Sequence, residues 1–445
     1  MKRIMVWGMA KSGIAAAKLL LEKGYFVRIN DLKTADKLEG IDVLKGLPID
    51  DKLGLPADGL LSDIDTLVMS PGIPADHKVA NTAREMGIKV IGEIELAYLF
   101  GKGKMIGITG TNGKTTTTTL LGEISKAWGK NTIVVGNIGE PYAAHVNELD
   151  DESYTICELS SFQLETIDTM KPDVALILNL TEDHLNRHKT IEKYASIKER
   201  VFMNMNEGSV ILNADDPITV KMAQNVKCRV VWFSRKKEVT IGAFVRDGKV
   251  IYRDGSDTEI IDTSLIGIPG PHNLENALAA VAGAMCAGAP VDVIRDTLIA
   301  FKGVEHRIET VRTVNGITYI NDSKGTNPDS TIKAVETMTK PTVILLGGSE
   351  KYSDYTSMCE VIKNSPVKYA VLLGDTGESI GRALAKAGFT DMEYVDHDFE
   401  KAIRTATDHA SDGWNVLLSP ACASFDMFSC FEERGEIFKD IVNKL

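Results

Sequence analysis

A glycine-rich loop between an apolar run and a Lys-Thr pair is the feature that most constrains the fold of this chain. The run Met105-Ile106-Gly107-Ile108-Thr109 continues as Gly110-Thr111-Asn112-Gly113-Lys114-Thr115-Thr116. The apolar run predicts a strand and residues 114–128 predict a helix, so the loop joins a strand to a helix N-terminus. Free backbone N–H groups and the helix dipole favour an anion at such a position. The order strand, loop, helix predicts an α/β fold.

The residue types of this loop fit a nucleoside triphosphate. Gly110 and Gly113 let backbone N–H groups close around phosphate oxygens. Lys114 supplies positive charge at the β and γ phosphates, and Thr115 offers a hydroxyl to Mg²⁺. Ile108 stands where the strict GxxxxGK[ST] spacing has its first glycine, so the loop is a variant of that motif. The alternative is a glycine turn with an incidental Lys-Thr-Thr, which the flanking strand and helix disfavour.

The same alternation of strands and helices recurs along the chain. A chain of 445 residues is too long to fold around a single hydrophobic core, and the alternation of strands and helices restarts twice. We therefore predict three consecutive α/β domains: residues 1–92, Rossmann-like; residues 93–302, a variant P-loop ATPase-like domain; and residues 303–445, again Rossmann-like. Strands are expected at residues 3–7, 26–30, 66–69, 105–109, 175–178, 318–321, 342–346, 370–373 and 416–418.

Charge and cysteine usage exclude several functional classes. The formal net charge of −12 argues against a nucleic-acid or acidic-membrane surface, because phosphate groups recruit clustered Lys and Arg. The six cysteines include no CxxC pair, so no zinc or redox motif is predicted and free thiols in a reducing cytosol are expected. The chain opens with Met1-Lys2-Arg3 and then a strand-like run, without the apolar length of a signal peptide or membrane span. We expect a cytoplasmic protein.

A second glycine loop follows the first predicted strand. Gly8-Met9-Ala10-Lys11-Ser12-Gly13 has Gly, Ala and Gly where the dinucleotide fingerprint has three glycines, and Asp31 follows the second strand. The functional interpretation is phosphate at a helix N-terminus. A tight strand-to-helix turn is the structural alternative, and the loop alone does not decide between them.

Polar residues follow two further predicted strands of the middle domain. Glu158 ends the strand that begins at Tyr154, and Asp183-His184 follows residues 174–178. The carboxyl ends of parallel strands bind ligands in open α/β sheets, so Glu158 is placed to hold a magnesium ion. His184 is equally a ligand or a loop residue by this reasoning. Lys198 lies in an amphipathic helical pattern and on that pattern alone belongs to a solvated charged face.

Six separated motifs together resemble the Mur ligase family, in the same order and over essentially the whole chain. They are Gly110 to Thr116 as quoted, Glu158-Leu159-Ser160-Ser161-Phe162-Gln163-Leu164-Glu165, Asp183-His184, His272-Asn273-Leu274-Glu275-Asn276, Asn321-Asp322-Ser323-Lys324-Gly325-Thr326-Asn327 and Ser419-Pro420-Ala421-Cys422-Ala423-Ser424-Phe425-Asp426. The last two are similar to those of the D-glutamate-adding members.

The resemblance implies a reaction in peptidoglycan precursor synthesis. ATP phosphorylates the terminal carboxylate of UDP-N-acetylmuramoyl-L-alanine, and the amino group of D-glutamate attacks the acyl phosphate to form an amide. Two anions meet in this reaction, so Mg²⁺ and lysines are needed to neutralise the transferred phosphoryl group. By similarity, Lys114, Glu158, His184 and Lys198 are catalytic. Thr115, Glu158, His184 and Lys198 surround two Mg²⁺ ions, with Lys198 carbamylated as a hypothesis.

The resemblance also implies positions for the substrates. The loop from Gly110 to Thr116, with Asn273, Arg307 and Asp322, binds ATP, Arg307 toward phosphate and Asp322 toward ribose. The remaining substrate-binding positions are Gly13, Asp31, Lys33, Ser70 and Gly72 for the uridine diphosphate, Asn137 for the muramoyl substrate, and Lys324, Thr326, Lys351, Ser419 and Phe425 for D-glutamate. Helix capping remains the alternative for the asparagines and surface pairing for Arg307.

One stretch departs from the family and several functions compete. Gly347-Gly348-Ser349-Glu350-Lys351 differs before the lysine, and the roles of Ser349 and Glu350 stay open. A sister ligase adding another amino acid, or acting on folate, is the nearest alternative, although folate enzymes usually show Gly-Lys-Gly-Ser in the phosphate loop. An NAD-dependent dehydrogenase or nucleotide sensor would leave Lys114 and the third domain unexplained. We expect a monomer that binds small molecules and neither nucleic acid nor membrane.

Overall fold

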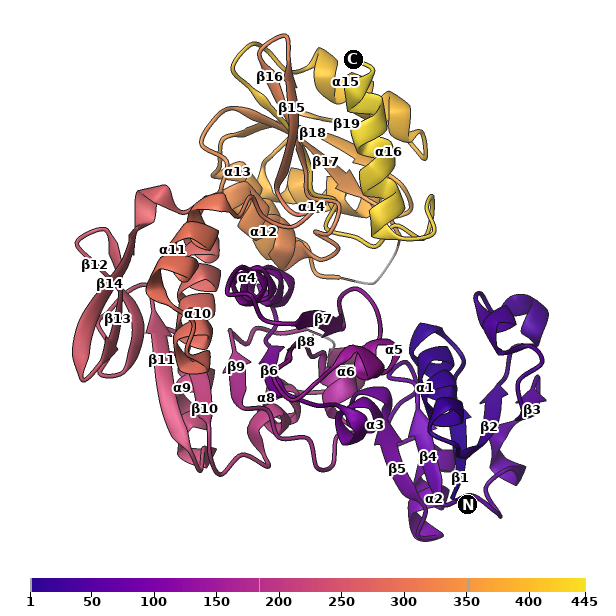
Figure 1. Cartoon of the computed structure of the whole chain (residues 1–445). Coiled ribbons are helices and arrows are strands. Elements are labelled where there is room, and N and C mark those ends of the chain that lie inside the picture. Colours follow the sequence, from indigo (N-terminus) through magenta and orange to yellow (C-terminus); the bar gives the residue numbers. More distant parts are fainter. Residues whose placement is uncertain (1, 184, 350–352) are drawn as a thin grey trace. The chain divides into compact units, whose positions relative to one another are not determined.

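Three sheets carry the fold of the chain (Figure 1). The computed structural model describes residues 2–183, 185–349 and 353–445. These residues separate into two compact units, one of residues 1–266 with 273–301 and the other of residues 267–272 with 302–445. The first two sheets belong to the first unit and the third sheet to the second unit. The predicted α/β class is confirmed. The predicted boundaries after residues 92 and 302 stay predictions.

The first sheet has five parallel strands in the order β3-β2-β1-β4-β5. Helix α1 covers one face and helix α2 the other, each through its own apolar cluster. The elements are β1 (Arg3–Trp7), α1 (Lys11–Glu22), β2 (Phe26–Asp31), β3 (Ile49–Leu53), β4 (Thr66–Met69), α2 (Lys78–Glu85) and β5 (Lys89–Gly92). The strand order changes direction between β1 and β4, so the loops after these two strands meet at one edge.

The second sheet has nine strands in the order β14-β13-β12-β11-β10-β9-β6-β8-β7. Neighbouring strands are parallel from β7, at one edge, across the sheet to β12, and β12, β13 and β14 pair antiparallel. Its strands are β6 (Lys104–Thr109), β7 (Thr132–Gly136), β8 (Tyr154–Glu158), β9 (Val174–Ile177), β10 (Ser209–Asn213), β11 (Arg229–Ser234), β12 (Gly242–Arg246), β13 (Lys249–Asp254) and β14 (Ser256–Asp262). β6 lies between β8 and β9, so the glycine loop and the segments after β8 and β9 emerge side by side.

Helices cover both faces of this sheet (Figure 1). Small residues in α10 allow a close approach, since a Cβ at Gly283 would lie 3.1 Å from Leu121 of α4. The other face packs against α5, α6 and α8. The helices of this part are α3 (Glu93–Phe100), α4 (Lys114–Ala127), α5 (Tyr142–His145), α6 (Ser161–Leu164), α7 (Leu185–His188), α8 (Ile191–Glu199), α9 (Pro217–Met222), α10 (Pro271–Ala287) and α11 (Val291–Ala300).

The third sheet has six strands in the order β15-β16-β20-β17-β18-β19, with only β15 antiparallel. Two apolar clusters fill its faces, one against α12 to α14 and the other against α15 and α16. The elements are β15 (Glu309–Val314), β16 (Ile317–Asn321), α12 (Pro328–Glu336), β17 (Thr342–Gly347), α13 (Thr356–Lys363), β18 (Val367–Leu373), α14 (Gly377–Ala387), β19 (Met392–Tyr394), α15 (Phe399–Asp408), β20 (Asn415–Leu418) and α16 (Phe431–Asn443). None of the described helices combines the length and apolar character that a bilayer crossing requires.

Candidate active site

The glycine loop has the strand-to-helix geometry that its sequence predicts. β6 ends at Thr109 and α4 begins at Lys114, with Gly113 as the preceding residue at φ +82°. A Cβ at Gly113 would lie 2.1 Å from Oδ1 of Asn276, a buried residue of α10. Only glycine fits both the left-handed backbone and this close approach. The loop is therefore shaped by α10 as well as by its own sequence.

The segment after β9 holds the glycine loop through hydrogen bonds to Thr111 and Asn112. The Asn112 N–H donates to Oδ1 of Asn179 at 2.8 Å, and the Asn179 amide donates back to the Asn112 carbonyl at 3.0 Å. The Thr111 N–H donates to the Asn179 carbonyl at 2.9 Å. The hydroxyl of Thr111 accepts from the N–H of Thr181 at 3.1 Å. Sequence reasoning did not give Asn179 a role, although its position directly after a buried strand was a usable signal.

Two lysine amines converge on the carbonyl of Gly110. Nζ of Lys114 donates to it at 3.0 Å and to the Thr111 carbonyl at 2.7 Å, so the side chain folds back over its own loop. Nζ of Lys198 donates to the same Gly110 carbonyl at 2.9 Å and to Oγ1 of Thr109 at 3.1 Å. The arrangement places two amines at the point where the loop turns into α4.

The solvated position that the helical pattern alone indicates for Lys198 is wrong. The side chain is 1% exposed and lies on the buried face of α8, with Nζ 4.8 Å from the ring centre of Tyr194. Burial holds the pKa of Lys198 well below its usual range, and the charge of Lys114 lowers it further, while Asp183 and Glu158 act in the opposite direction. Burial therefore favours the neutral, nucleophilic form of this amine.

Glu158 ends β8 as predicted and presents one oxygen that has no partner among the described residues. Its Oε1 accepts from Nδ2 of Asn137 at 2.8 Å. Its Oε2 is buried and has no hydrogen-bond partner among the residues that the structure describes. A buried carboxylate oxygen left unpaired is costly, which suits a bound cation. Thr115, 4% exposed, stands in the first turn of α4. His184 lies outside the described residues.

The predicted uridine-diphosphate positions gather at the edge between β1 and β4. The carboxylate of Asp31 accepts from the N–H of Met9 at 2.8 Å and from the N–H of Lys33 at 2.9 Å. It therefore shapes the first glycine loop. A Cβ at Gly13 would lie 2.0 Å from the carbonyl oxygen of Gly8, so the loop needs glycine there. The two predictions for this loop, an anion site and a tight turn, are compatible in this geometry.

Arg187 joins this edge to the middle sheet, and sequence reasoning missed it. Its guanidinium donates to the Pro71 and Ile73 carbonyls, both at 3.2 Å, on either side of the predicted Gly72. It also pairs with the carboxylate of Glu165, which the α6 motif supplies. Both side chains are largely buried, with 16% and 11% exposure. The turn that carries Ser70 and Gly72 is thereby tied to the segment that follows Asp183.

In the second unit, Asp322 and Ser419 meet across 97 residues of sequence. The Ser419 hydroxyl donates to Oδ2 of Asp322 at 2.6 Å, and the Ile308 N–H donates to Oδ1 at 3.2 Å. β16 and β20 are neighbours, so their carboxyl ends bring the two side chains together. Burial raises the pKa of Asp322 to about 7, although these hydrogen bonds and the charge of Arg307 lower it in part. The predicted D-glutamate role of Ser419 stays a prediction.

The other predicted D-glutamate positions have different surroundings. Nζ of Lys324 lies 5.0 Å from the ring centre of Phe431. The Thr326 N–H donates to the Lys324 carbonyl at 2.9 Å, closing a tight turn. Phe425 is 73% exposed, as are several other large apolar side chains to a similar or lesser degree, so its exposure alone does not mark a binding surface. Lys351 and Glu350 lie outside the described residues.

Arg434 is a buried cation that sequence reasoning also missed. It is 1% exposed, and its guanidinium donates to the Ser323 hydroxyl and carbonyl at 2.9 and 2.8 Å and to the Cys422 carbonyl at 3.2 Å. Burial lowers the pKa of Arg434 to about 10, so it stays charged near neutral pH. It fixes the two motif loops of the third sheet to each other.

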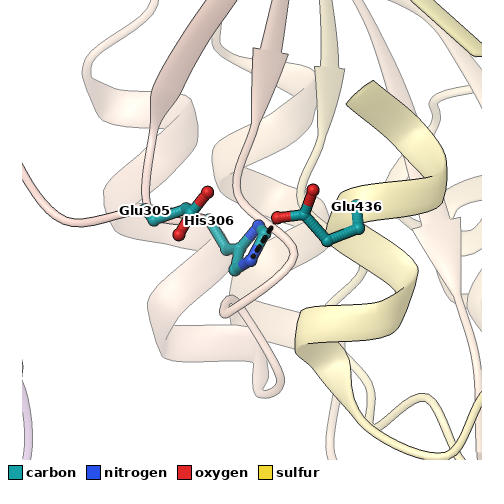
Figure 2. A group of neighbouring side chains, drawn as sticks. All are labelled: Glu305, His306 and Glu436. Carbon is teal, nitrogen blue, oxygen red and sulfur yellow. Dashed lines mark ion pairs between the residues drawn. The ribbon is translucent and has the colours of Figure 1, made fainter. Parts of the chain in front are cut away.

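Figure 2 shows a carboxylate and histidine cluster that resembles a metal site in composition only. Nε2 of His306 lies 3.4 Å from Oε1 of Glu436, and Glu305 is adjacent. Nζ of Lys439 pairs with Glu305 and lies 2.8 Å from Oε1 of Glu436. The lysine already supplies the positive charge, so the cluster is best explained as an ion-pair network that attaches α16 to the segment before β15.

Comparison with known proteins covers nearly the whole chain. Three family models match: the Mur ligase MurD-like N-terminal domain at residues 2–92, the Mur ligase middle domain at residues 108–284 and the Mur ligase glutamate ligase domain at residues 306–422. A protein of Thermoanaerobacter sp. (strain X514) named UDP-N-acetylmuramoylalanine--D-glutamate ligase is 45% identical over 448 residues, covering 100% of this chain and 98% of that protein. One of the same name from Clostridioides difficile (strain 630) is 44% identical over 449 residues, covering 100% and 99%.

A solved structure shares the fold at low sequence identity. The MurF ligase of Thermotoga maritima in complex with ADP superimposes with a TM-score of 0.61 at 16% identity, covering 94% of this chain and 95% of that one. At this identity the likeness concerns the fold.

Proposed function

Because the chain belongs to the Mur ligase family, we propose that it joins D-glutamate to UDP-N-acetylmuramoyl-L-alanine in an ATP-dependent reaction of peptidoglycan precursor synthesis. The observation that carries the proposal is 45% identity to a D-glutamate ligase along the full length of the chain. The structure supports it with a phosphate loop in one unit and the predicted amino-acid motifs in the other. The enzyme is proposed to act as a monomer in the cytoplasm on small-molecule substrates.

The proposed mechanism assigns the first step to the unit that carries the glycine loop. The N-terminus of α4, which begins at Lys114, and the amine of Lys114 bind and orient the ATP phosphates. The substrate carboxylate attacks the γ-phosphorus, the bond to the β-phosphate oxygen breaks, and ADP leaves. The amine of D-glutamate then attacks the acyl carbon, loses a proton and expels phosphate, which leaves the new amide. Asn273, buried in α10, and Arg307 and Asp322 are proposed to bind ATP as well.

The donors around the loop fit Mg²⁺. The unpaired Oε2 of Glu158, the hydroxyl of Thr115 and a carbamate on Lys198 are oxygen ligands, which this cation prefers. His184 is proposed as a further ligand. When bound, Mg²⁺ supplies charge neutralisation at the phosphoryl group.

Carbamylation of Lys198 follows from its setting beside the loop. Burial lowers the pKa of the Lys198 amine and so favours its neutral form, which can attack CO₂, form a C–N bond and release a proton. The product is an anion, which attracts the ammonium of Lys114 and places a further oxygen ligand beside the carboxylate of Glu158.

We expect that dialysis against CO₂-free buffer lowers turnover and that bicarbonate restores it. Intact mass spectrometry under native conditions would show an added carboxyl group on wild type and none on Lys198→Arg, whose side chain cannot form the carbamate. Full activity with an unmodified Lys198 and no bicarbonate dependence would contradict the proposal.

The function itself is tested by phosphate release from ATP with each substrate present or omitted. We expect release only when UDP-N-acetylmuramoyl-L-alanine and D-glutamate are both present, with the amide product identified by mass spectrometry. L-Glutamate and L-lysine are the matched controls, and a sister ligase would prefer another amino acid. Release that is indifferent to D-glutamate would overturn the proposal.

A further inference from the structure

The turn that follows β4 contacts the first glycine loop at the ligand edge of the first sheet. The strand order changes direction between β1 and β4, which is where open α/β sheets bind nucleotides. The Ser70 N–H donates to the Trp7 carbonyl at 2.9 Å, and a Cβ at Gly8 would lie 2.6 Å from Cβ of Ser70. The Ile73 N–H donates to the Ser70 carbonyl at 3.1 Å and closes the turn. A shift of this turn would therefore displace the first glycine loop as well.

Arg187 of α7 holds this turn from the side of the middle sheet. Its Nη1 donates to the Pro71 carbonyl and its Nη2 to the Ile73 carbonyl, both at 3.2 Å. The same guanidinium bonds to both carboxylate oxygens of Glu165 and lies 4.4 Å from the ring centre of Phe162. Arginine presents its donors in a fixed planar fork, so it can hold two carbonyls and a carboxylate in a defined arrangement.

α7 is itself held against the middle sheet by its last residue. His188 is buried, and its Nε2 lies 2.9 Å from Oγ of Ser161 in α6. The ring centre of His188 lies 5.4 Å from that of Tyr194 in α8, whose hydroxyl accepts from Oγ1 of Thr111 at 3.4 Å. Arg187 therefore extends toward the first sheet from a fixed segment, and its guanidinium can set the position of the turn.

The contact at Pro71 fixes the direction of a backbone donor. Pro71 and Pro74 have no N–H group. The Ile73 N–H is used within the turn, so Gly72 supplies the remaining N–H of residues 71–74. The peptide bond between Pro71 and Gly72 is trans, so a Pro71 carbonyl directed at the guanidinium turns the Gly72 N–H to the opposite side. An N–H in a fixed direction suits an anionic ligand such as a diphosphate.

The attachment of the first sheet to the middle sheet does not depend on Arg187. The Gly92 N–H, at the end of β5, donates to the Thr166 carbonyl at 3.1 Å. The buried carboxylate of Glu95 in α3 accepts from the N–H groups of residues 168–170 at 2.8 to 3.0 Å. These bonds join β5 and α3 to the segment after α6. Loss of the guanidinium should therefore loosen the turn after β4 without separating the two sheets.

We propose that Arg187, held in place by Glu165, is a positioning residue for the uridine-diphosphate part of the substrate. The guanidinium keeps the Gly72 N–H and the first glycine loop in the arrangement that receives the diphosphate. Because the carboxylate of Glu165 neutralises it, the arginine contributes position rather than net charge. This proposal rests on the proposed function, and it assigns a role to two residues that have none in it.

The test is calorimetric binding of UDP-N-acetylmuramoyl-L-alanine, and of ADP, to Arg187→Met. We expect the Kd for UDP-N-acetylmuramoyl-L-alanine, and its KM in turnover, to rise about tenfold, the effect of losing a charge-assisted hydrogen bond, with the Kd for ADP within twofold of wild type. Arg187→Lys keeps the charge but has a single amine, so an intermediate rise of about threefold is expected. Hydrogen exchange at residues 70–73 should become faster in Arg187→Met and stay unchanged at residues 168–170.

Arg200→Met is the matched control in the same unit. Arg200 also donates to two backbone carbonyls, those of Leu164 and Ile167, but both belong to the middle sheet's own segment. Its loss is expected to leave the Kd for UDP-N-acetylmuramoyl-L-alanine and the exchange of residues 70–73 as in wild type.

Glu165→Gln keeps the proposal testable if Arg187→Met does not fold. The amide keeps one oxygen acceptor and loses the charge, so the Kd for UDP-N-acetylmuramoyl-L-alanine is expected to rise about threefold. The double variant should be no worse than Arg187→Met alone, since both changes act through one guanidinium. An unchanged Kd in Arg187→Lys and Glu165→Gln, or equal rises in the Kd for ADP, would overturn the positioning role. Turnover of wild type that did not require UDP-N-acetylmuramoyl-L-alanine would instead refute the proposed function.

Discussion

At the scale of single residues, Asp322 is a carboxyl group that folding places in an environment unfavourable to its charge. It is 3% exposed, and burial raises its pKa from 3.8 to about 7. Between these pH values the folded state holds a proton that the unfolded state has released. Stability therefore falls as pH rises from about 4 to about 7 and levels off above that, because the unfolded chain binds fewer protons than the native one. The group is retained at a stability cost, which suits a functional role such as ribose binding.

We predict that Asp322→Asn removes this pH dependence while impairing ATP use. The melting temperature of the variant relative to wild type should increase from pH 5 to pH 8, corresponding to a few kcal/mol at most, roughly 1.4 kcal/mol per unit of pKa shift. The KM for ATP should rise at the same time. Thermal unfolding without ligands across this pH range is the measurement, and a constant difference between the two proteins would contradict the prediction.

At the scale of secondary structure, α4 carries glycines at both ends with nearly the same backbone but different surroundings. Gly113 precedes the helix at φ +82°, and Gly129 follows it at φ +79°. A Cβ at Gly113 would lie 2.1 Å from the Asn276 amide oxygen, whereas a Cβ at Gly129 would meet no atom within 4 Å. Substitutions at these two glycines can therefore distinguish the effect of backbone strain from the effect of displacing the phosphate loop.

We predict that Gly113→Ala and Gly129→Ala both lower stability by about 1–2 kcal/mol, the strain of a left-handed alanine. Only Gly113→Ala should lower kcat/KM for ATP, by at least tenfold, since Asn276 and the loop must separate to admit the methyl group. Urea unfolding and ADP binding by calorimetry would measure the two effects. If the two variants kept the same kcat/KM, the close approach to Asn276 would have no functional consequence.

The predictability of the fold varied between elements for physical reasons. β1 and β4 match their predicted residues because parallel strands buried on both faces read as continuous apolar runs. Strands β12, β13 and β14, which pair antiparallel with one another, were not predicted. Asp247-Gly248, which joins Arg246 to Lys249, is nevertheless a strong hairpin signal. At the site, the strand-end rule anticipated Glu158. It could not anticipate that Asn276 shapes the loop, because that contact depends on how α10 packs.

Lys198 shows where pattern reasoning fails within an element. Tyr194, Ile197 and Lys198 share the buried face of α8. The spacing of four residues from Tyr194 placed Lys198 on that face, but a lysine is ordinarily assigned to solvent because its burial is costly. The family resemblance implies a different role for this residue, carbamylation beside the glycine loop, which stays a prediction. The proximity of Asp322 to Ser419 likewise depends on the order of strands in the sheet, in which β16 and β20 are neighbours, and the sequence does not show this order.

At the scale of the whole molecule, the glycine loop and the positions predicted for D-glutamate lie in different units. The first holds the glycine loop, Lys114 and Glu158, and the second holds Asp322, Ser419 and the exposed Phe425. Phosphoryl transfer is proposed to depend on charge compensation at the loop, and recognition of D-glutamate on cations and donors near the third sheet. Variants of Lys114 and variants of the predicted D-glutamate positions should therefore change different kinetic constants.

We predict that Lys114→Ala abolishes turnover, because no other group on the loop supplies its charge at the transferred phosphate. Lys351→Ala should instead raise the KM for D-glutamate at least tenfold and leave ADP binding as in wild type, since a lysine that binds a carboxylate acts on one substrate only. Isothermal calorimetry with ADP and kinetics with D-glutamate varied would separate the two. Lys333→Ala is the control for removing a positive charge from the second unit, because its ammonium pairs with Glu336 on the surface of α12. Equal effects of Lys114→Ala and Lys351→Ala on nucleotide binding would show that the division of tasks between the units is wrong.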